Sequence, residues 1–226
     1  MLTVGLVMAT RDRLDMTREA IRSIPKGHVP RLVVVDDGST DGTRRFLSDK
    51  GLRWIDGASR PGISAKWNLG IERCIADGAT HVAVLNNDIL LCPVTLDGML
   101  LRIARPRVLA VVGHNIKGKV SEPRDALTYT EQIDEDVVAP DWGAFMISKE
   151  CWSRVGRFDE GFVGVDFEDV DYLWRINRAD GTCHCTRLAP YYHHVGASKA
   201  ARLGVAKLHK ANRAHFERKW NYKWPI

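Results

Sequence analysis

The sequence predicts an α/β protein built on a mostly parallel sheet with helices on its faces. Short apolar, β-branched segments alternate with segments of helical periodicity through the first 110 residues, which is the rhythm of βαβ units. Polar clusters follow three of the apolar segments, at residues 10–13, 36–39 and 86–88. Because ligands of such sheets bind at the carboxyl ends of the strands, we expect these clusters to meet at one edge.

The length and composition are those of one globular domain. The chain has 226 residues, of which 45% are apolar and 27% charged, and this is enough to bury one sizeable core. We therefore predict a single domain over residues 1–226. The apolar run at residues 2–9 ends at Arg11, and no later run approaches the length of a membrane span.

The five cysteines indicate a reducing, cytoplasmic location. Their number is odd, and their spacing is not that of a disulfide framework. Cys183-His184-Cys185 contains metal-binding residue types, but no second Cys/His pair stands at zinc-ligand spacing. We therefore interpret Cys183 and Cys185 as small hydrophobic residues on a strand.

Strand and helix are expected to alternate in the first half. The predicted elements are, in order, strand 2–9, helix 15–24, strand 31–35, a helix that includes 44–47, strand 52–55, helix 64–76 and strand 81–85. Ser39 or Thr40 is expected to cap the second helix, because a hydroxyl can accept a hydrogen bond from a first-turn amide.

The second half is less regular. A strand pair is expected within 111–129, and a buried strand at 144–147. Apolar residues at helical spacing predict a helix over 166–178, and Asp166 is a candidate for its N-cap. A last helix is expected over about 200–220.

The C-terminal segment is basic. From Lys199 onward it contains eight Lys or Arg and one acidic residue, Glu217, which indicates either an anionic partner or a solvated helix face. Trp220, Tyr222 and Trp224 interleave with these charges, a pattern suited to peripheral contact with a membrane. The tryptophans could instead pack the helix on the core, and both interpretations stay open. No nucleic-acid-binding motif accompanies the charge, so nucleic acid is not an expected partner.

The segment VVVDDGSTDGT at 33–43 places two carboxylates at the end of a predicted strand. A buried unpaired carboxylate is costly, whereas an accessible one can accept a hydrogen bond from a pyrimidine N–H. Gly38 permits the chain to turn tightly after the strand. An ordinary acidic turn followed by a helix cap is the alternative.

This segment resembles the nucleotide-binding signature of glycosyltransferase family 2, and in particular of its inverting, rhamnosyltransferase-like members. The resemblance implies a GT-A fold, with a small antiparallel element beside the parallel sheet and the basic helix at the C-terminus. It also implies that Asp37 contacts the nucleotide base and that Asp36 and Gly38 shape the loop. Thr10 and Arg11 would lie on the same side of the donor.

Residues 61–70 (PGISAKWNLG) resemble the family segment Gly-x-Ser-x-x-x-Asn-x-Gly, which lines the nucleotide-sugar pocket. The resemblance implies donor contacts for Lys66 and Asn68. Trp67 stands where the family commonly has Arg, and Arg60 where it commonly has Asn, so Lys66 is a candidate for the contact with the diphosphate. A capped helix that packs Trp67 on the core is the alternative.

The segment LNND at 85–88 resembles the Asp-x-Asp with which GT-A enzymes bind a divalent cation after a strand. Asn86 takes the place of the first acid, so the resemblance implies that Asp88 is the direct ligand of Mn²⁺ or Mg²⁺. Such cations bind hard oxygen ligands. Asn87 is expected to contact the donor. Outside this context, the same residues would be read as a turn.

Residues 141–148 and 155–175 resemble the acceptor side of the family. The resemblance assigns this side five residues: Trp142, Gly143, Glu168, Asp169 and Asp171. A sugar hydroxyl has a high pKa, so its attack needs a base within hydrogen-bond reach. Asp169 is the base that the resemblance implies, with Glu168 adjacent and Asp171 as a weaker candidate. Acidic residues favoured by the dipole of a helix N-terminus are the alternative.

The segment HHVGAS at 193–198 resembles a His-x-Gly-x-Ser element of the family whose histidine reaches the metal or the diphosphate. His194 fits the spacing better than His193. Neutral imidazole is a reasonable ligand for Mn²⁺, but a structural histidine is the alternative.

Together these resemblances imply a metal-dependent glycosyltransferase that moves a sugar from a UDP-, dTDP- or GDP-sugar to a hydroxyl, with inversion. The acceptor is a glycan, a lipid-linked sugar or a protein. Residues 1–110 would bind the donor, 111–198 would form the acceptor half, and 199–226 the basic helix. A non-catalytic nucleotide-sugar-binding relative and a sugar nucleotidyltransferase are the alternatives. The second lacks support, because no glycine-rich loop follows the first strand.

Overall fold

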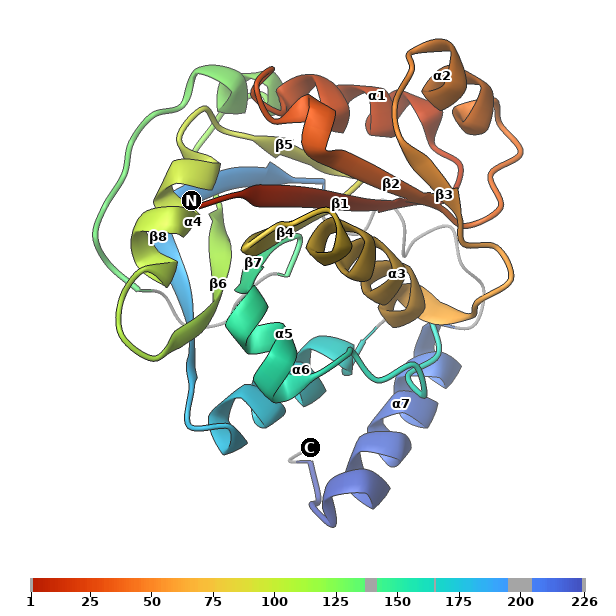
Figure 1. The fold of residues 1–226 in the computed structure, drawn as a ribbon, viewed down its shortest axis with the longest axis vertical. Coiled ribbons are helices and arrows are strands. Elements are labelled where there is room, and N and C mark those ends of the chain that lie inside the picture. Colours follow the sequence, from red (N-terminus) through yellow and green to blue (C-terminus); the bar gives the residue numbers. More distant parts are fainter. Residues whose placement is uncertain (1, 137–141, 165, 195–204, 225–226) are drawn as a thin grey trace.

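An eight-stranded sheet runs through the computed structural model, which describes residues 2–136, 142–164, 166–194 and 205–224 (Figure 1). Its strand order is β3-β2-β1-β4-β7-β6-β8-β5. The pairs β3/β2, β2/β1, β1/β4 and β6/β8 are parallel, and β4/β7, β7/β6 and β8/β5 are antiparallel. The predicted class, a mostly parallel sheet with a smaller antiparallel part, is therefore confirmed.

The order of the predicted elements is confirmed in the first half, with boundaries shifted by a few residues. The strands are β1 (Val4–Thr10), β2 (Leu32–Asp36), β3 (Trp54–Asp56), β4 (His81–Asn86), β5 (Ile89–Leu91), β6 (Val108–Asn115), β7 (Ala144–Ser148) and β8 (Thr182–His193). The helices are α1 (Leu14–Ser23), α2 (Thr43–Asp49), α3 (Gly62–Ala76), α4 (Thr95–Ile103), α5 (Lys149–Val155), α6 (Glu168–Arg178) and α7 (Val205–Trp220), with short 3-10 turns η1 (Val29–Arg31) and η2 (Pro123–Thr128).

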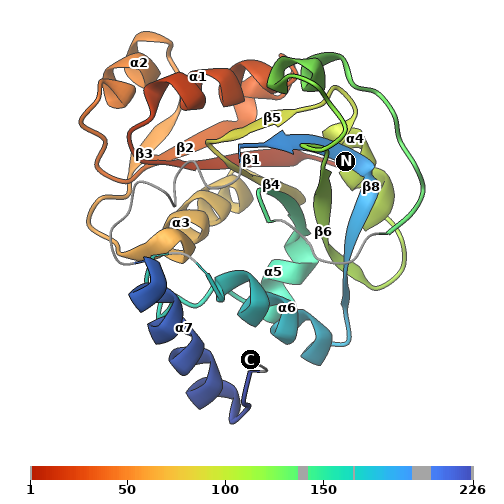
Figure 2. The ribbon, with the colours of Figure 1, turned by 180° about the vertical axis from the view of Figure 1, so that it is seen from behind.

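Helices cover both faces of the sheet, because the inner strands are apolar on both sides (Figures 1 and 2). Alternate residues of β1 show this division. Leu6 and Met8 pack with α1, α2 and α4, whereas Val7 and Ala9 pack with α3, α5 and α6. Continuous burial is what a parallel strand covered on two faces requires.

The strand pair predicted within 111–129 is wrong. This part of the chain contributes one strand, β6, and then the 3-10 turn η2. The segment after β6 contains Lys117, Gly118 and Lys119 and reaches Pro123, which has no N–H for a ladder. The partners of β6 are β7 and β8, which come from later in the chain.

The predicted caps of two helices are also wrong. At α2, Asp41 Oδ1 accepts hydrogen bonds from the amide and the hydroxyl of Thr43, at 3.1 and 2.6 Å, while the Ser39 hydroxyl accepts one from the amide of Asp12. At α6, the N-cap position is Phe167 in a left-handed conformation (φ 73°) and not Asp166. Both turns are held by contacts with residues far away in the chain, and the local sequence does not reveal these contacts.

The C-terminal helix α7 packs on the body of the protein. Phe162 and Phe167 form a buried cluster with Phe216 of α7, and Trp220 and Trp224 pack against it. The interpretation in which the tryptophans pack on the core is therefore confirmed for these two residues. Within the described ranges, no helix is both long and apolar enough to cross a membrane.

The cysteines are free, as expected. Cys185 is buried on β8, and Cys183, two residues earlier on the same strand, is half-buried. In the part of the chain that the structure describes, no group of three or more His, Cys, Asp or Glu residues is arranged to hold a metal ion. Both residues therefore lie on a strand as expected, and of the two only Cys185 is fully buried there.

Asp171, a predicted acceptor-side residue, instead belongs to the contact between α6 and α7. Its side chain is fully buried. The carboxylate accepts hydrogen bonds from Arg175 Nε and Trp220 Nε1, each at 2.9 Å, and lies 2.7 Å from Lys219 Nζ. A carboxylate held between two cations and an indole inside the protein joins α6 to α7, and it is not placed to act as a base.

We expect Asp171→Ala to destabilise the protein strongly, because it leaves Arg175 and Lys219 without their buried anion. Loss of one partner of a buried ion pair costs about 3 kcal/mol or more, which for a chain of this size lowers the melting temperature by about 6–12 °C. Thermal unfolding followed by circular dichroism measures it. Glu150→Ala, which removes an exposed pair with Arg154, is the control and should change stability by less than about 0.5 kcal/mol. Equal melting temperatures for the two variants would contradict the structural role of Asp171.

Candidate functional site

The three predicted polar clusters meet at one edge of the sheet. Thr10 at the end of β1 is in register with Asp36 of β2, and Ala9 is in register with Asn86 of β4. The amide of Asp37 donates a hydrogen bond to the carbonyl of Thr10 at 2.8 Å. The parallel pairing thus brings together residues from three separate segments of the chain.

A buried hydroxyl pair joins the first and third clusters. Thr10 Oγ1 lies 2.8 Å from Thr17 Oγ1, and Asn87 Nδ2 donates to both hydroxyls, at 3.1 and 3.2 Å. The side chain of Thr10 is only 3% exposed. Thr10 and Asn87 therefore fix the loop after β4 against β1 and α1, and they shape the edge of the sheet from within.

Asp36 holds the loop after β2 through hydrogen bonds to its backbone. Its carboxylate is fully buried. Oδ1 accepts hydrogen bonds from the amides of Gly38 and Ser39, at 3.1 and 3.0 Å, and from the guanidinium of Arg44. Gly38 has φ 82°, a conformation that glycine adopts without strain.

Asp37 carries the accessible carboxylate of this pair. Its side chain is 24% exposed, and Lys66 Nζ lies 2.7 Å from Oδ1 while Arg11 Nη1 lies 3.7 Å from Oδ2. Lys66 also donates to the carbonyl of Arg60, and its side chain is 2% exposed. In this structure the ammonium of Lys66 is buried against Asp37, and its contact with a diphosphate stays a prediction.

Asn68, a predicted donor contact, holds backbone groups of a distant loop in this structure. It is fully buried on α3, and its amide exchanges two hydrogen bonds with the backbone of Phe158, at 2.8 and 2.9 Å. It also donates to Glu160 at 3.0 Å, and this hydrogen bond is the main cause that lowers the pKa of the Glu160 carboxyl. Asn68 thus ties the donor-side helix to a loop 90 residues later in the chain.

Asp88 lies beside His193. Asp88 is 6% exposed, and its Oδ1 is 3.1 Å from His193 Nε2 at the end of β8. The amide of His194 donates a hydrogen bond to the carbonyl of Asp88 at 2.9 Å, and the imidazole ring of His194 contacts Tyr192 edge-on. Sequence spacing favoured His194 for the metal, but the antiparallel pairing of β8 with β5, in which His193 lies opposite Ile89, brings the ring of His193 to the carboxylate.

Gly143 makes room for this pair. A Cβ at position 143 would lie 2.8 Å from His193 Nδ1 and 3.1 Å from the ring of Tyr191. Its carbonyl accepts a hydrogen bond from the amide of Asn86 at 2.8 Å. Trp142, the other predicted residue of this segment, is 7% exposed and packs on Phe145 at 4.8 Å between ring centroids, so most of its ring is part of the core.

The acidic turn lies at the start of α6. Glu168 is 7% exposed, whereas Asp169 is half-buried and therefore more accessible. Asp169 Oδ1 accepts a hydrogen bond from the amide of Val170 at 2.8 Å. A carboxylate in the first turn is stabilised by the positive end of the helix dipole. The residues of the His-x-Gly-x-Ser element after His194 lie outside the described residues.

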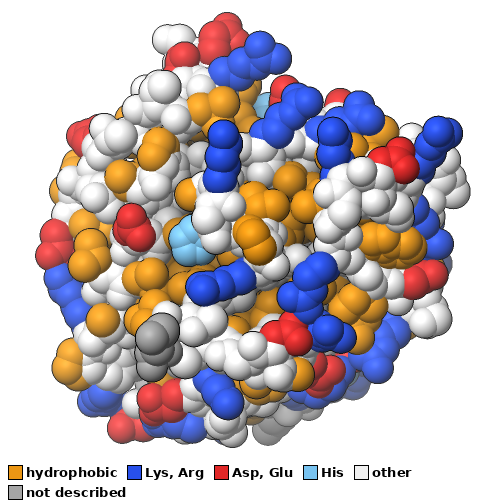
Figure 3. Space-filling model, turned by 45° about the horizontal axis from the view of Figure 1, so that its top comes forward, with side chains coloured by type: hydrophobic (Ala, Val, Ile, Leu, Met, Phe, Trp, Pro, Cys, Tyr) orange, Lys and Arg blue, Asp and Glu red, His pale blue; other side chains and the backbone are white. Residues whose placement is uncertain are grey.

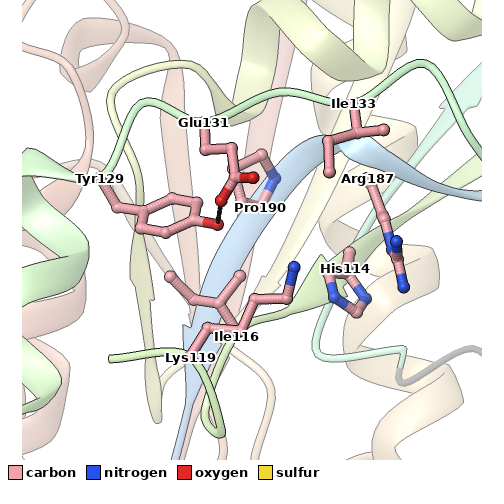
Figure 4. A pocket seen from close by; sticks show the side chains of 8 residues that line it. All are labelled: His114, Ile116, Lys119, Tyr129, Glu131, Ile133, Arg187 and Pro190. Carbon is pink, nitrogen blue, oxygen red and sulfur yellow. Dashed lines mark hydrogen bonds between the residues drawn. The ribbon is translucent and has the colours of Figure 1, made fainter. Parts of the chain in front are cut away.

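Two surface depressions lie apart from these residues. One, lined by Leu14, Arg18, Phe46 and others, has a volume of about 370 Å³ between α1 and α2. Figure 3 shows Lys and Arg side chains spread over this end of the molecule, with hydrophobic side chains between them. The other lies between the end of β6 and the middle of β8, beneath Tyr129 and Glu131 (Figure 4). Neither is lined by a predicted site residue.

The chain is similar to two solved glycosyltransferases. The first is GalNAc-T7, crystallised with UDP, GalNAc and Mn²⁺ (TM-score 0.64, 14% identity, 85% of this chain and 44% of that one). The second is glucosyl-3-phosphoglycerate synthase from Mycobacterium tuberculosis, crystallised with Mg²⁺ and UDP (TM-score 0.64, 16% identity, 97% of this chain and 79% of that one). These likenesses confirm the GT-A fold.

A curated relative is the uncharacterised protein y4gI of Sinorhizobium fredii, which is 25% identical over 255 residues. The match covers 97% of this chain, but the chain spans only 27% of the length of that relative. The model of glycosyl transferase family 2 matches residues 6–163, which include the ends of β1, β2 and β4. The chain therefore belongs to glycosyltransferase family 2.

Proposed function

We propose that this protein is a metal-dependent, inverting hexosyltransferase that moves a sugar from a nucleoside-diphosphate sugar to an acceptor hydroxyl. The observation that carries the proposal is that Asp37 and Asp88 follow β2 and β4, two strands that both run parallel to β1 and end at the same edge of the sheet. Family membership supports sugar transfer, and the solved relatives crystallised with UDP support a nucleotide-diphosphate donor.

Asp37 is the proposed contact for the nucleotide base. It keeps part of its carboxylate accessible, while Lys66 and Arg11 beside it balance its charge. A carboxylate accepts a hydrogen bond from the N–H of uracil, thymine or guanine, which supports a UDP-, dTDP- or GDP-sugar. Asp36, Thr10 and Asn87 keep the loops around it in place.

The residues around Asp88 fit a divalent cation. Asp88 supplies a hard carboxylate oxygen and His193 an imidazole nitrogen, both nearly buried and directed at each other. Two protein ligands suffice where the phosphates of a donor supply further oxygens. Mn²⁺ or Mg²⁺ bound here would act as a Lewis acid on the diphosphate.

Asp169 is the proposed base. It is the more accessible acid of the first turn of α6, whereas Glu168 is nearly buried and Asp171 is fully buried. Asp169 would accept the proton of the acceptor hydroxyl as its oxygen attacks the anomeric carbon, on the face opposite the departing diphosphate. The acceptor is proposed to be a glycan, a lipid-linked sugar or a protein.

We expect Asp169→Asn to bind nucleotide normally and to lose transfer, because an amide cannot accept the proton. Removal of a general base lowers turnover by about 10²–10⁴-fold. The measurement is release of nucleoside diphosphate from UDP-, dTDP- and GDP-sugars in the presence of acceptor mixtures. Glu150→Gln, an exposed acid on α5, is the control. Near-normal turnover of Asp169→Asn would show that another residue is the base.

We expect Asp88→Ala and His193→Ala to weaken the Mn²⁺-dependent binding of nucleotide by at least about tenfold, because each removes a proposed metal ligand. Titration calorimetry with UDP, dTDP and GDP, with and without Mn²⁺, measures the effect. His194→Ala is the matched control and should bind almost normally. A loss in His194→Ala together with normal binding in His193→Ala would restore His194, the residue that the sequence favours, as the ligand.

A further inference from the structure

The loop between α5 and α6 carries the acidic turn and has little secondary structure of its own. It covers residues 156–167, and two of its last residues, Asp166 and Phe167, adopt left-handed conformations with φ 83° and 73°. Such conformations are unfavourable for residues other than glycine and persist where surrounding contacts hold them. The direction in which Glu168 and Asp169 leave the loop therefore depends on what holds it.

One side of the loop is held by the donor-side helix. The amide of Ile63 in the first turn of α3 donates to the carbonyl of Gly164 at 3.1 Å. Gly62 has φ 77°, and a Cβ there would lie 2.9 Å from the carbonyl of Phe162. The loop thus lies directly against the start of the helix that supplies Lys66.

The other side is held by α7, which lies next to this loop in both ribbon views (Figures 1 and 2). Asn212, in the middle of α7, is only 1% exposed. Its Oδ1 accepts a hydrogen bond from the amide of Val163 at 2.9 Å, and its Nδ2 donates to the carbonyls of Val163 and Asp166, at 3.0 and 2.9 Å. One side chain therefore satisfies backbone groups on both arms of the turn that precedes α6.

Further contacts fix α7 in this position. Lys219 and His215 lie 2.6 and 3.2 Å from Asp159 at the start of the loop. Burial raises the pKa of the Asp159 carboxyl. This is outweighed by hydrogen bonds from Lys219, the amide of Gly161 and His215, which bring the pKa down to about 2. Phe216 belongs to one buried cluster with Phe162 and Phe167. The part of the helix that follows Asn212 is thus anchored by charge and by apolar packing.

We propose that Asn212 is a positioning residue for the acceptor side: it holds the left-handed turn at Asp166 and Phe167, and so directs Asp169 toward the acceptor. The inference rests on the proposed function for the role of Asp169. It gives α7 a role in transfer, in place of the peripheral contact that its charge suggests. A purely structural role for Asn212 would instead affect stability alone.

Hydrogen exchange tests the physical link without any substrate. In Asn212→Ala we expect the backbone amides of residues 162–171 to exchange at least about tenfold faster, because the loop loses its partner. The exchange rates of the amides of residues 33–43 should be unchanged.

Arg213→Ala is the matched control, since its contacts with Glu217 and the carbonyl of Trp224 lie within the C-terminal segment itself. Unchanged exchange over 162–171 in Asn212→Ala would overturn the proposal. If the alanine variant does not fold, the same exchange measurement is made on the isosteric Asn212→Asp, which loses the two donated hydrogen bonds.

Turnover separates positioning from stability. With the donor that the enzyme accepts, we expect Asn212→Ala to lower kcat at least about tenfold with little change in the KM for donor. Combined with Asp169→Asn, it should lower kcat no further, because Asn212 acts only through Asp169. If the two losses multiply, Asn212 does not act through Asp169 and the proposal is wrong. Normal turnover in Asp169→Asn alone would instead contradict the proposed function, and the exchange result would still stand.

Discussion

Strand β1 lies between β2 and β4, and because the three run parallel their carboxyl ends fall at one edge of the sheet. The carboxylates of Asp36, Asp37 and Asp88 then lie close to the core and need partners, since an unpaired buried charge is costly. Asp36 accepts hydrogen bonds from backbone amides and pairs with Arg44. Asp37 pairs with Lys66, and Asp88 lies within hydrogen-bond distance of His193. Strand pairing thus sets both where the site lies and which carboxylates stay accessible.

The parts that the sequence predicts well are those that depend on local pattern. Continuous apolar runs identify β1, β2 and β4, and the polar residues that follow them identify the edge. Asp36 and Asp37 differ in role because Asp36 is the last residue of its strand and is fully buried, whereas Asp37 is the first residue of the loop. The order of the motifs is sufficient to indicate the family.

The parts that the sequence does not predict depend on contacts between distant residues. Lys66 and Asn68 lie in the expected segment, but the first is buried against Asp37 and the second bonds to a loop 90 residues away. His193 and His194 are adjacent, and only the register of β8 on β5 decides which ring meets Asp88. In the sequence, Asp171 belongs to one acidic cluster with Glu168 and Asp169. In the structure its carboxylate instead contacts Lys219 and Trp220 of α7. No local spacing encodes these pairings.

The loop between α5 and α6 joins α3, the acidic turn and α7. Asn68 and Ile63 of α3 hold it from the donor side, and Asn212 holds it from α7. The acidic turn at Glu168 and Asp169 is therefore positioned by elements from the first and last thirds of the chain. This explains how a basic C-terminal helix can belong to the catalytic domain.

The most direct test of the account is thermal unfolding with UDP, GDP, dTDP and CDP, each with and without Mn²⁺. A ligand at about 100 times its dissociation constant adds about 2.7 kcal/mol of stability, which for a chain of this size raises the melting temperature by about 5–10 °C. We expect such a shift for UDP, dTDP or GDP, only with Mn²⁺, and its loss in Asp88→Ala. No shift with any nucleotide would contradict it and would leave a family member that kept the fold without binding a donor.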